Sequence, residues 1–188
     1  MKQFIAYWQK PIFPSASSAN VIMSRTHMLI ISALLAALAA VFQSAGGFVP
    51  GIGYLISPFS TLPIVVAACI SMTSGFFTYV AAIGLLFMLQ PGELFIFPFT
   101  TGLLGLAIGL SIKIVKRRLP VVLLSGTVLF LGISFVAFVL QFPLFGPRSA
   151  LGPAILSIVL IFSLFYSYFW VEISRLFLQR IFPILKHR

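Results

Sequence analysis

Acidic residues are nearly absent from this chain. Its 188 residues contain only 2 Asp plus Glu, Glu93 and Glu172, and 7% of all residues are charged. A soluble domain carries roughly a quarter charged residues, so the sequence lacks the polar groups needed to cover a water-exposed surface. This scarcity excludes a soluble globular enzyme, and the 61% hydrophobic content excludes a disordered chain.

Cysteine is scarce as well. Cys69 is the single cysteine, which excludes a disulfide framework and a zinc site built from several cysteines. Lys and Arg together number 12, but they are too widely spread among long apolar runs to form a nucleic-acid-binding surface. We therefore expect no nucleic-acid partner. What remains is an integral membrane protein of one domain.

Six apolar segments are close in length to the roughly 20 residues that a helix needs to cross a bilayer. The predicted spans are Met28–Gly46, Tyr54–Ile70, Ser74–Leu89, Leu94–Ile112, Leu119–Phe142 and Gly152–Val171. Their apolar runs are continuous rather than alternating with period two, which favours helices over the strands of a barrel. The predicted fold is an all-α, polytopic membrane protein, a six-transmembrane-helix bundle.

The basic residues predict the orientation of this bundle. With the N-terminus inside, Arg148 is the one cation of 12 that lies outside, so we expect an N-in/C-in topology in a bacterial-type cell membrane. An N-terminal cytoplasmic or interfacial arm (1–27) precedes the membrane domain (28–178), and a basic cytoplasmic tail (179–188) follows it. The arm is not a typical secretory signal, and a start at Met23 is an alternative. The segment Glu172–Ile181 is expected to continue the last helix along the membrane surface.

Catalytic and metal-binding patterns are missing. The chain has no Asp, its two Glu residues lie at opposite predicted membrane faces, and no His/Glu pair has metal-ligand spacing. No serine lies in a G-x-S-x-G frame. Ion-coupled carriers hold carboxylates near the bilayer midplane, and this chain has none there. We therefore expect no enzyme activity, no metal site and no cofactor.

Polar side chains concentrate in the outer halves of the predicted spans and in the outer loops. They are Gln43, Ser44, Tyr54, Ser57, Ser60, Thr61, Gln90, Glu93, Thr100, Thr101, Gln141 and Arg148. Polar groups near lipid cost free energy unless they are partnered or hydrated, so this clustering favours a water-filled pocket that opens outward. In the alternative interpretation, several of them cap helices or bond to their own backbone. Glu93 has two compatible interpretations: it complements a helix dipole, or it flanks the pocket with Arg148.

Small residues and prolines form two further patterns. Small residues recur at intervals of four in the first span, at Ser32, Ala33, Ala36, Ala37 and Ala40, and in the fourth span, at Gly105 and Gly109. Such spacing permits close helix approach in lipid. For the glycines we expect packing within the bundle, whereas the alanines fit internal packing and partner docking equally well. In the second span, Pro58 and Pro63 predict a kinked or partly unwound start; the alternative is a loop before a helix that begins near Ser60.

These features resemble the S components of energy-coupling factor (ECF) vitamin transporters. Six helices with both ends cytoplasmic, a chain of about this length and an Ala-x-x-x-Ala first helix are shared. The stretch YLISPFSTLPIVVAA, Tyr54–Ala68, is similar to the start of the second helix in riboflavin-type S components. An aromatic-Ser-x-x-Pro pattern recurs there, and in this chain it is Phe59–Pro63.

The resemblance implies a substrate-capture subunit that binds a vitamin or similar small micronutrient at the outer face. It also implies a transmembrane coupling subunit and two cytoplasmic ATPases as partners, with docking through Ala33, Ala36, Ala37 and Ala40. The implied substrate-binding residues are Gln43, Tyr54, Ser57, Thr61, Gln90, Glu93, Gln141 and Arg148. Riboflavin-type proteins carry acidic residues around the Phe59–Pro63 pattern, and this chain has none there. A ligand other than riboflavin, weakly charged and partly aromatic, is therefore expected.

Three other functions remain as alternatives. A non-catalytic membrane scaffold, such as a small protein of rod-shape morphogenesis, would have a similar size and topology but no outward cluster of polar residues. A small-solute channel would need polar residues through the whole membrane thickness, whereas the inner half of these spans is much more apolar. A membrane enzyme is the weakest alternative, since no catalytic pair can be assembled.

Overall fold

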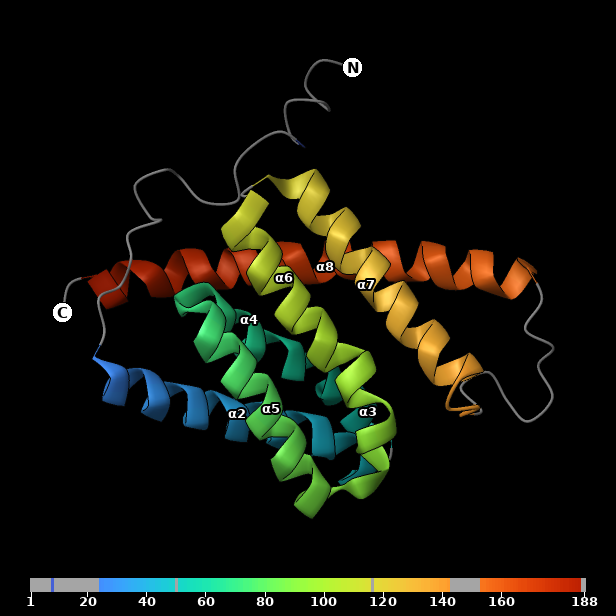
Figure 1. The fold of residues 1–188 in the computed structure, drawn as a ribbon, viewed down its shortest axis with the longest axis horizontal. Coiled ribbons are helices and arrows are strands. Elements are labelled where there is room, and N and C mark those ends of the chain that lie inside the picture. The colour runs from blue at the N-terminus through green and yellow to red at the C-terminus, as the bar shows by residue number, and fades with distance from the viewer. Residues whose placement is uncertain (1–7, 9–23, 50, 116, 143–152, 187–188) are drawn as a thin grey trace.

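The chain is helical along nearly all of its described length (Figure 1). The computed structural model describes residues 8, 24–49, 51–115, 117–142 and 153–186, with side chains up to residue 180. Six helical segments in these ranges are long and apolar enough to cross a membrane: Arg25–Phe48, Gly53–Ile70, Met72–Leu89, Pro91–Val115, Arg118–Phe138 and Pro153–Arg180. The prediction of an all-α protein with six membrane-length helices is confirmed.

The first and last spans are single helices. Helix α2 (Arg25–Phe48) begins three residues earlier than predicted, because the Ser24 side chain accepts a hydrogen bond from the backbone N–H of His27 and caps the helix. Helix α8 (Pro153–Lys186) has 34 residues, about 51 Å of helix, which exceeds the about 30 Å thickness of a hydrocarbon core. It runs without a break across residue 178, where the predicted membrane domain ends, and Figure 1 shows it as one nearly straight rod.

Two spans are interrupted in the half where the polar residues gather. The second consists of α3 (Gly53–Ile56), the 3₁₀ segment η2 (Ser57–Ser60) and α4 (Thr61–Ile70). The fourth consists of two 3₁₀ segments, η3 (Pro91–Phe95) and η4 (Phe97–Phe99), followed by α6 (Thr101–Val115). Prolines near the start of η2, η3 and η4 account for the change, because proline removes a backbone donor. The predicted partly unwound start of the second span is confirmed, and it is helical rather than an extended loop.

The remaining spans are regular helices, α5 (Met72–Leu89) and α7 (Arg118–Phe138). The fifth span ends four residues before the predicted Phe142. Val139 is the C-cap, and Gln141, three residues beyond the last helical residue, has a left-handed φ of 51° that is incompatible with continuing the helix. Beyond it, the Phe142 ring stacks on Phe95 of η3 with ring centroids 6.2 Å apart.

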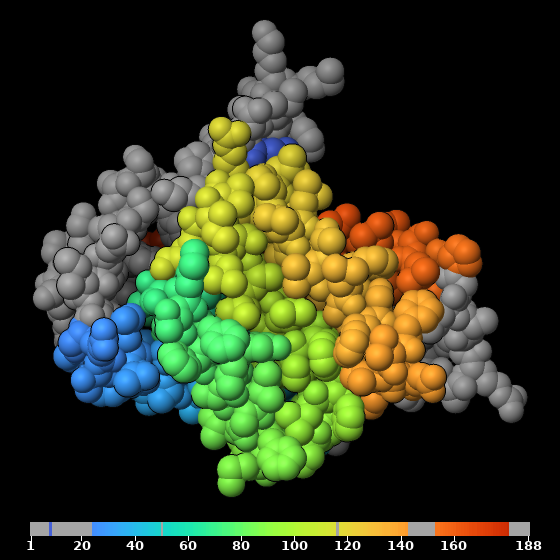
Figure 2. All heavy atoms as spheres, in the orientation of Figure 1, coloured from blue at the N-terminus to red at the C-terminus, as the bar shows by residue number. Residues whose placement is uncertain are grey.

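The bundle is assembled from neighbouring pairs. Helix α2 packs on α5 and α4, α6 lies between α4 and α7, and α8 packs mainly on α7. Figure 2 shows the side chains of α5, α6 and α7 lying side by side on one face. Glycines allow the close approach of α4 and α6: a Cβ at Gly105 would lie 2.7 Å from the Thr61 carbonyl oxygen, and one at Gly109 would lie 2.4 Å from the Ala68 Cβ. The expected internal packing role of these two glycines is confirmed.

The outer surface of the bundle is apolar. Large hydrophobic side chains are exposed on most of the spans, among them Leu34, Phe87, Met88, Leu131, Ile161 and Phe165. A soluble protein does not expose apolar area on this scale, whereas a bilayer solvates it. Together with the six long helices, this surface identifies a multi-pass membrane protein.

Candidate functional site

The polar side chains of the broken spans converge on Gln43 of α2. Only 3% of Gln43 is exposed. Its Oε1 accepts hydrogen bonds from Ser60 Oγ at 2.7 Å and from Thr101 Oγ1 at 2.9 Å. Its Nε2 donates to Oε2 of Glu93 at 2.7 Å. We call these four residues the Gln43 cluster. It joins α2, η2, η3 and α6 at one end of the bundle.

The interruptions in the second and fourth spans position this cluster. Ser60 occupies the N-cap position of α4, but its hydroxyl makes no capping bond and donates to Gln43 instead. Thr101 is the first residue of α6, where the chain leaves the 3₁₀ segments. The neighbouring Thr61 donates to the Thr101 carbonyl oxygen at 3.3 Å, which ties the two helix starts together. Prolines thus place two hydroxyls opposite one amide.

Glu93 supplies the only formal charge of the Gln43 cluster. Its carboxylate accepts one hydrogen bond, from Gln43, and makes no ion pair with any described residue. No bond from a backbone N–H to this carboxylate occurs within the described ranges, and α6 begins eight residues later, at Thr101. Glu93 does lie in the first turn of η3, at the start of the fourth span, and this position fits the interpretation that its carboxylate complements a helix dipole. Arg148, its predicted partner, lies outside the described residues.

The structure brings three of the predicted binding residues together and separates the others. Gln43, Thr61 and Glu93 belong to or adjoin the Gln43 cluster. Tyr54 and Ser57 instead face Gly46 across the junction of α2 and α3: a Cβ on this glycine would lie 3.6 Å from each of their side chains.

Gln90 and Gln141 also lie apart from the cluster. The Gln90 side chain lies against Gly47, with Nε2 only 1.9 Å from where a Cβ would be. Gln141 is exposed and lies three residues beyond the end of α7, with a left-handed backbone. Ser60 and Thr101 belong to the Gln43 cluster, although neither is among the predicted substrate-binding residues. The signal that identifies them is their position at helix starts directly after proline-containing segments.

The Gln43 cluster is closed in this conformation. Ser60 and Thr61 are fully buried, and Gln43 is almost so. Every polar atom of the Gln43 side chain is engaged by another side chain. The arrangement is a hydrogen-bonded core at one end of the bundle, rather than a set of side chains around an open cavity.

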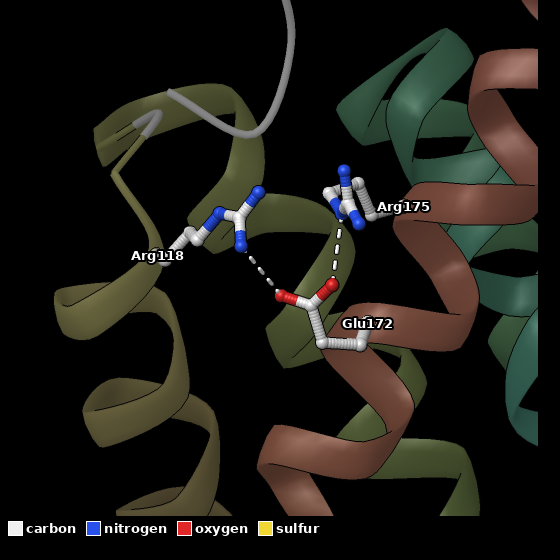
Figure 3. Close-up of polar contacts among 3 residues, drawn as sticks. All are labelled: Arg118, Glu172 and Arg175. Atoms are coloured by element: carbon white, nitrogen blue, oxygen red, sulfur yellow. Dashed lines mark hydrogen bonds and ion pairs between the residues drawn. The ribbon is translucent and has the colours of Figure 1, made fainter. Parts of the chain in front are cut away.

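A second polar cluster lies at the start of α7 (Figure 3). Arg118 Nη1 contacts Glu172 Oε1 at 3.1 Å, and Arg175 Nε contacts Glu172 Oε2 at 2.9 Å. The Arg118 side chain is 8% exposed, and that of Glu172 is 19% exposed. The carboxylate of α8 therefore holds the first residue of α7. Each carboxylate oxygen is already bonded to an arginine, so we assign this cluster a structural role.

The four alanines of α2 do not share one exposed face. Ala36 and Ala40 are 0% exposed on the side of α2 that packs on α5, where Ser32 bonds to Ser74 across the same interface. Ala33 and Ala37 are exposed. In this structure Ala36 and Ala40 are covered within the bundle and Ala33 and Ala37 are accessible to a partner, and docking through these alanines stays a prediction.

Metal chemistry has no structural basis in the described part of the chain, where no three His, Cys, Asp or Glu residues are grouped closely enough to hold an ion. Cys69 is buried in the core.

The chain matches no family model, and no curated protein or solved structure is significantly similar to it. Among the described residues, the Gln43 cluster joins polar side chains from four helical elements, α2, η2, η3 and α6.

Proposed function

We propose that this protein is the substrate-capture subunit of an ECF-type, ATP-driven importer, and that it binds a small micronutrient at the Gln43 cluster. The supporting observation is the cluster itself: an amide, two hydroxyls and a carboxylate meet at one end of a bundle whose outer surface is apolar. Such groups provide directional recognition, which a lipid-facing bundle does not need for stability.

The position of the Gln43 cluster supports the proposal. The described cations lie at the opposite end of the spans, where Lys113 donates to the Ile70 carbonyl oxygen at 2.9 Å and Arg118 and Arg175 pair with Glu172. Cytoplasmic membrane ends carry the excess of Lys and Arg. We accordingly orient the protein with both ends in the cytoplasm and the Gln43 cluster toward the outside of the cell membrane.

The broken spans provide a means of opening. Segments η2, η3 and η4 have 3₁₀ geometry, whose hydrogen bonds are weaker than those of an α-helix and which often marks a hinge. A solute that donates and accepts hydrogen bonds would replace the contacts between Gln43 and the hydroxyls of Ser60 and Thr101. Binding would then alter the relative positions of α2, η2 and η3, and the partner subunits would respond to that change.

Helix α2 would provide the docking surface. The exposed Ala33 and Ala37 lie four residues apart, so they form a small-x-x-x-small row on the lipid-facing side. The proposed partners are the ECF transmembrane coupling subunit on this row and two cytoplasmic ATPases below it. The chain itself would perform no catalysis, and it would hold no metal or cofactor.

The test is recovery of partners in mild detergent from the native host, with mass spectrometry of the co-purified proteins. We expect an ECF-type transmembrane subunit with two ATPases. Ala37→Trp should abolish their recovery, because an exposed indole would hold the partner helix away from α2. Ile161→Trp is the matched control: Ile161 is 69% exposed on α8, so its replacement adds the same ring to another lipid-facing surface and should leave recovery unchanged. Equal loss in both variants, or recovery without these partners, contradicts the proposal.

The closed state of the Gln43 cluster favours one other function. A membrane scaffold would use the same hydrogen bonds to fix the mutual positions of α2, η2 and α6, and the full burial of Ser60 and Thr61 fits that role. Recovery of cell-wall synthesis or cytoskeletal proteins in the same experiment would establish the scaffold and exclude the importer subunit.

A further inference from the structure

Glu93 carries a negative charge at the end of the bundle that we orient outward, and it has no ion-pair partner among the described residues. Its side chain is partly buried, and a single neutral amide is its hydrogen-bond donor. Arg118 and Arg175, which could neutralise a carboxylate, both pair with Glu172 near the start of α7. Removing a charge from water is costly unless it is paired. The Glu93 carboxylate is therefore available to pair with a positively charged group.

The hydrogen-bond directions in the Gln43 cluster decide what kind of group it can accept. Two hydroxyls donate to Gln43 Oε1, which fixes the amide so that Nε2 points at Glu93. The amide oxygen is thus already used. The acceptor capacity left over lies on the carboxylate, which has two oxygens and about four lone-pair sites. The cluster presents a negative, accepting surface, and an anion would be repelled by it.

An organic cation fits this surface better than a metal ion does. Calcium takes 6–8 oxygen ligands and magnesium needs a near-octahedral set, whereas the cluster has one carboxylate, and the other acid of the chain, Glu172, is bonded to Arg118 and Arg175. An organic cation needs only one counter-charge and apolar surroundings. Phe95, two residues after Glu93, is 51% exposed at the same end of the protein, and Phe142 stacks on one face of its ring, so the other face is the one that could contact a cation.

We propose that the solute bound at the Gln43 cluster is a small organic cation, and that Glu93 is its counter-charge. This inference rests on the proposed function, since it assumes that this end of the protein captures a solute. It narrows the expected ligand from a weakly charged micronutrient to an ammonium-type or otherwise cationic one.

The first test needs no ligand. In nanodiscs without added solute, Glu93→Gln should raise the thermal unfolding midpoint by about 2–4 °C, because glutamine keeps the size and a hydrogen bond to Gln43 while removing the unpaired charge. If Arg148 or any other group already neutralises Glu93, the substitution removes a favourable pair and the midpoint falls. A fall would overturn the proposal, whatever ligand is later found.

The second test compares charged and uncharged probes of one shape. Choline and ethanolamine are each compared with an uncharged isostere, in which tert-butyl replaces trimethylammonium or hydroxyl replaces ammonium, at equal millimolar concentration and with ionic strength matched by sodium chloride. We expect at least one cation to raise the midpoint by at least about 2 °C, its isostere to have no effect, and Glu93→Gln to abolish the rise. Equal stabilisation by the isosteres or by sodium chloride, stabilisation that persists in Glu93→Gln, or no response to either cation would overturn the proposal.

The outcomes also separate this proposal from the proposed function. Recovery of the ECF partners together with failure of both cation tests would retain the importer subunit and exclude a cationic ligand. A response to cations that depends on Glu93, without recovery of those partners, would establish a cation-binding membrane protein of another class.

Discussion

Replacing Gln43 with leucine should destabilise the protein more than any other single polar-to-apolar change at this end of the bundle. Leucine is close to glutamine in size, so the substitution leaves little cavity. It leaves the buried hydroxyl of Ser60, the Thr101 hydroxyl and the Glu93 carboxylate without their shared partner. The cost therefore comes from unsatisfied polar groups rather than from packing.

The magnitude follows from the three bonds. Two neutral hydrogen bonds contribute about 1 kcal/mol each, and one to a charged group contributes about 1.5–3 kcal/mol. Interhelical bonds in membrane proteins average only about 0.6 kcal/mol, and the freed hydroxyls of Ser60 and Thr101 can turn to nearby carbonyl oxygens. We expect a net loss of about 2–4 kcal/mol, or a fall of about 5–12 °C in the unfolding midpoint of a chain of this length.

The assay is thermal unfolding in nanodiscs, with Gln90→Leu as the matched control. Gln90 lies at the same end of the protein and is half-buried against Gly47, but its side chain makes none of the side-chain hydrogen bonds found in the described ranges. Its replacement should change the midpoint by less than about 2 °C. A double variant, Gln43→Leu with Glu93→Leu, should lose less than the sum of the single losses, because removing both partners leaves no stranded carboxylate. Equal midpoints for Gln43→Leu and Gln90→Leu would refute this reasoning.

Three further changes test other parts of the structure by the same unfolding assay. Glu172→Gln should cost about 1–3 kcal/mol, less than the about 3–5 kcal/mol of a fully buried pair, because the Glu172 and Arg175 side chains are 19% and 22% exposed; an unchanged midpoint would show that the pairing does not stabilise the fold. Gly109→Ala should cost about 1–3 kcal/mol, since its Cβ would lie 2.4 Å from the Ala68 Cβ, whereas Gly84→Ala meets no atom within 4 Å and should be neutral or stabilising. Gln141→Gly should stabilise the protein by about 1 kcal/mol, because glycine adopts the φ of 51° without strain; a loss of stability would show that the side chain matters more than the backbone.

The arrangement of spans was predictable because it depends on local properties of the sequence. Long apolar runs determine which segments can cross a bilayer, and Gly, Pro and charged residues mark where the runs stop. All six helices were found where the runs predict them. The predicted ends were less accurate where they depend on backbone geometry that the sequence does not display, such as the end of α7 at Phe138 and the left-handed backbone at Gln141 beyond it.

The role of the α2 alanines could not be settled by spacing. At 100° per residue, Ala33, Ala36, Ala37 and Ala40 span about 100° of the helix circumference, so they look like one face. Contact with α5 covers Ala36 and Ala40 completely and leaves Ala33 and Ala37 exposed. The boundary of the area that α5 buries therefore runs between these four alanines. Its place depends on the position of the neighbouring helix, which the spacing does not show.

The Gln43 cluster shows the same limit for polar residues. A surplus of polar side chains in the outer halves of the spans predicted that some of them would meet, because isolated polar groups are unstable in lipid. Which ones meet depends on contacts between residues that are 17, 50 and 58 positions apart. The feature of the sequence that best indicates these contacts is the proline before each hydroxyl: Pro58 precedes Ser60, and Pro98 precedes Thr101. In both spans the residue that carries the hydroxyl lies where a 3₁₀ segment gives way to an α-helix. An interrupted helix frees the side chain at its restart from capping its own backbone, as Ser60 shows by bonding to Gln43 instead. In this chain, the position of a polar residue at the end of a proline-containing 3₁₀ segment is therefore a better indicator of membership in the Gln43 cluster than the number of polar residues around it.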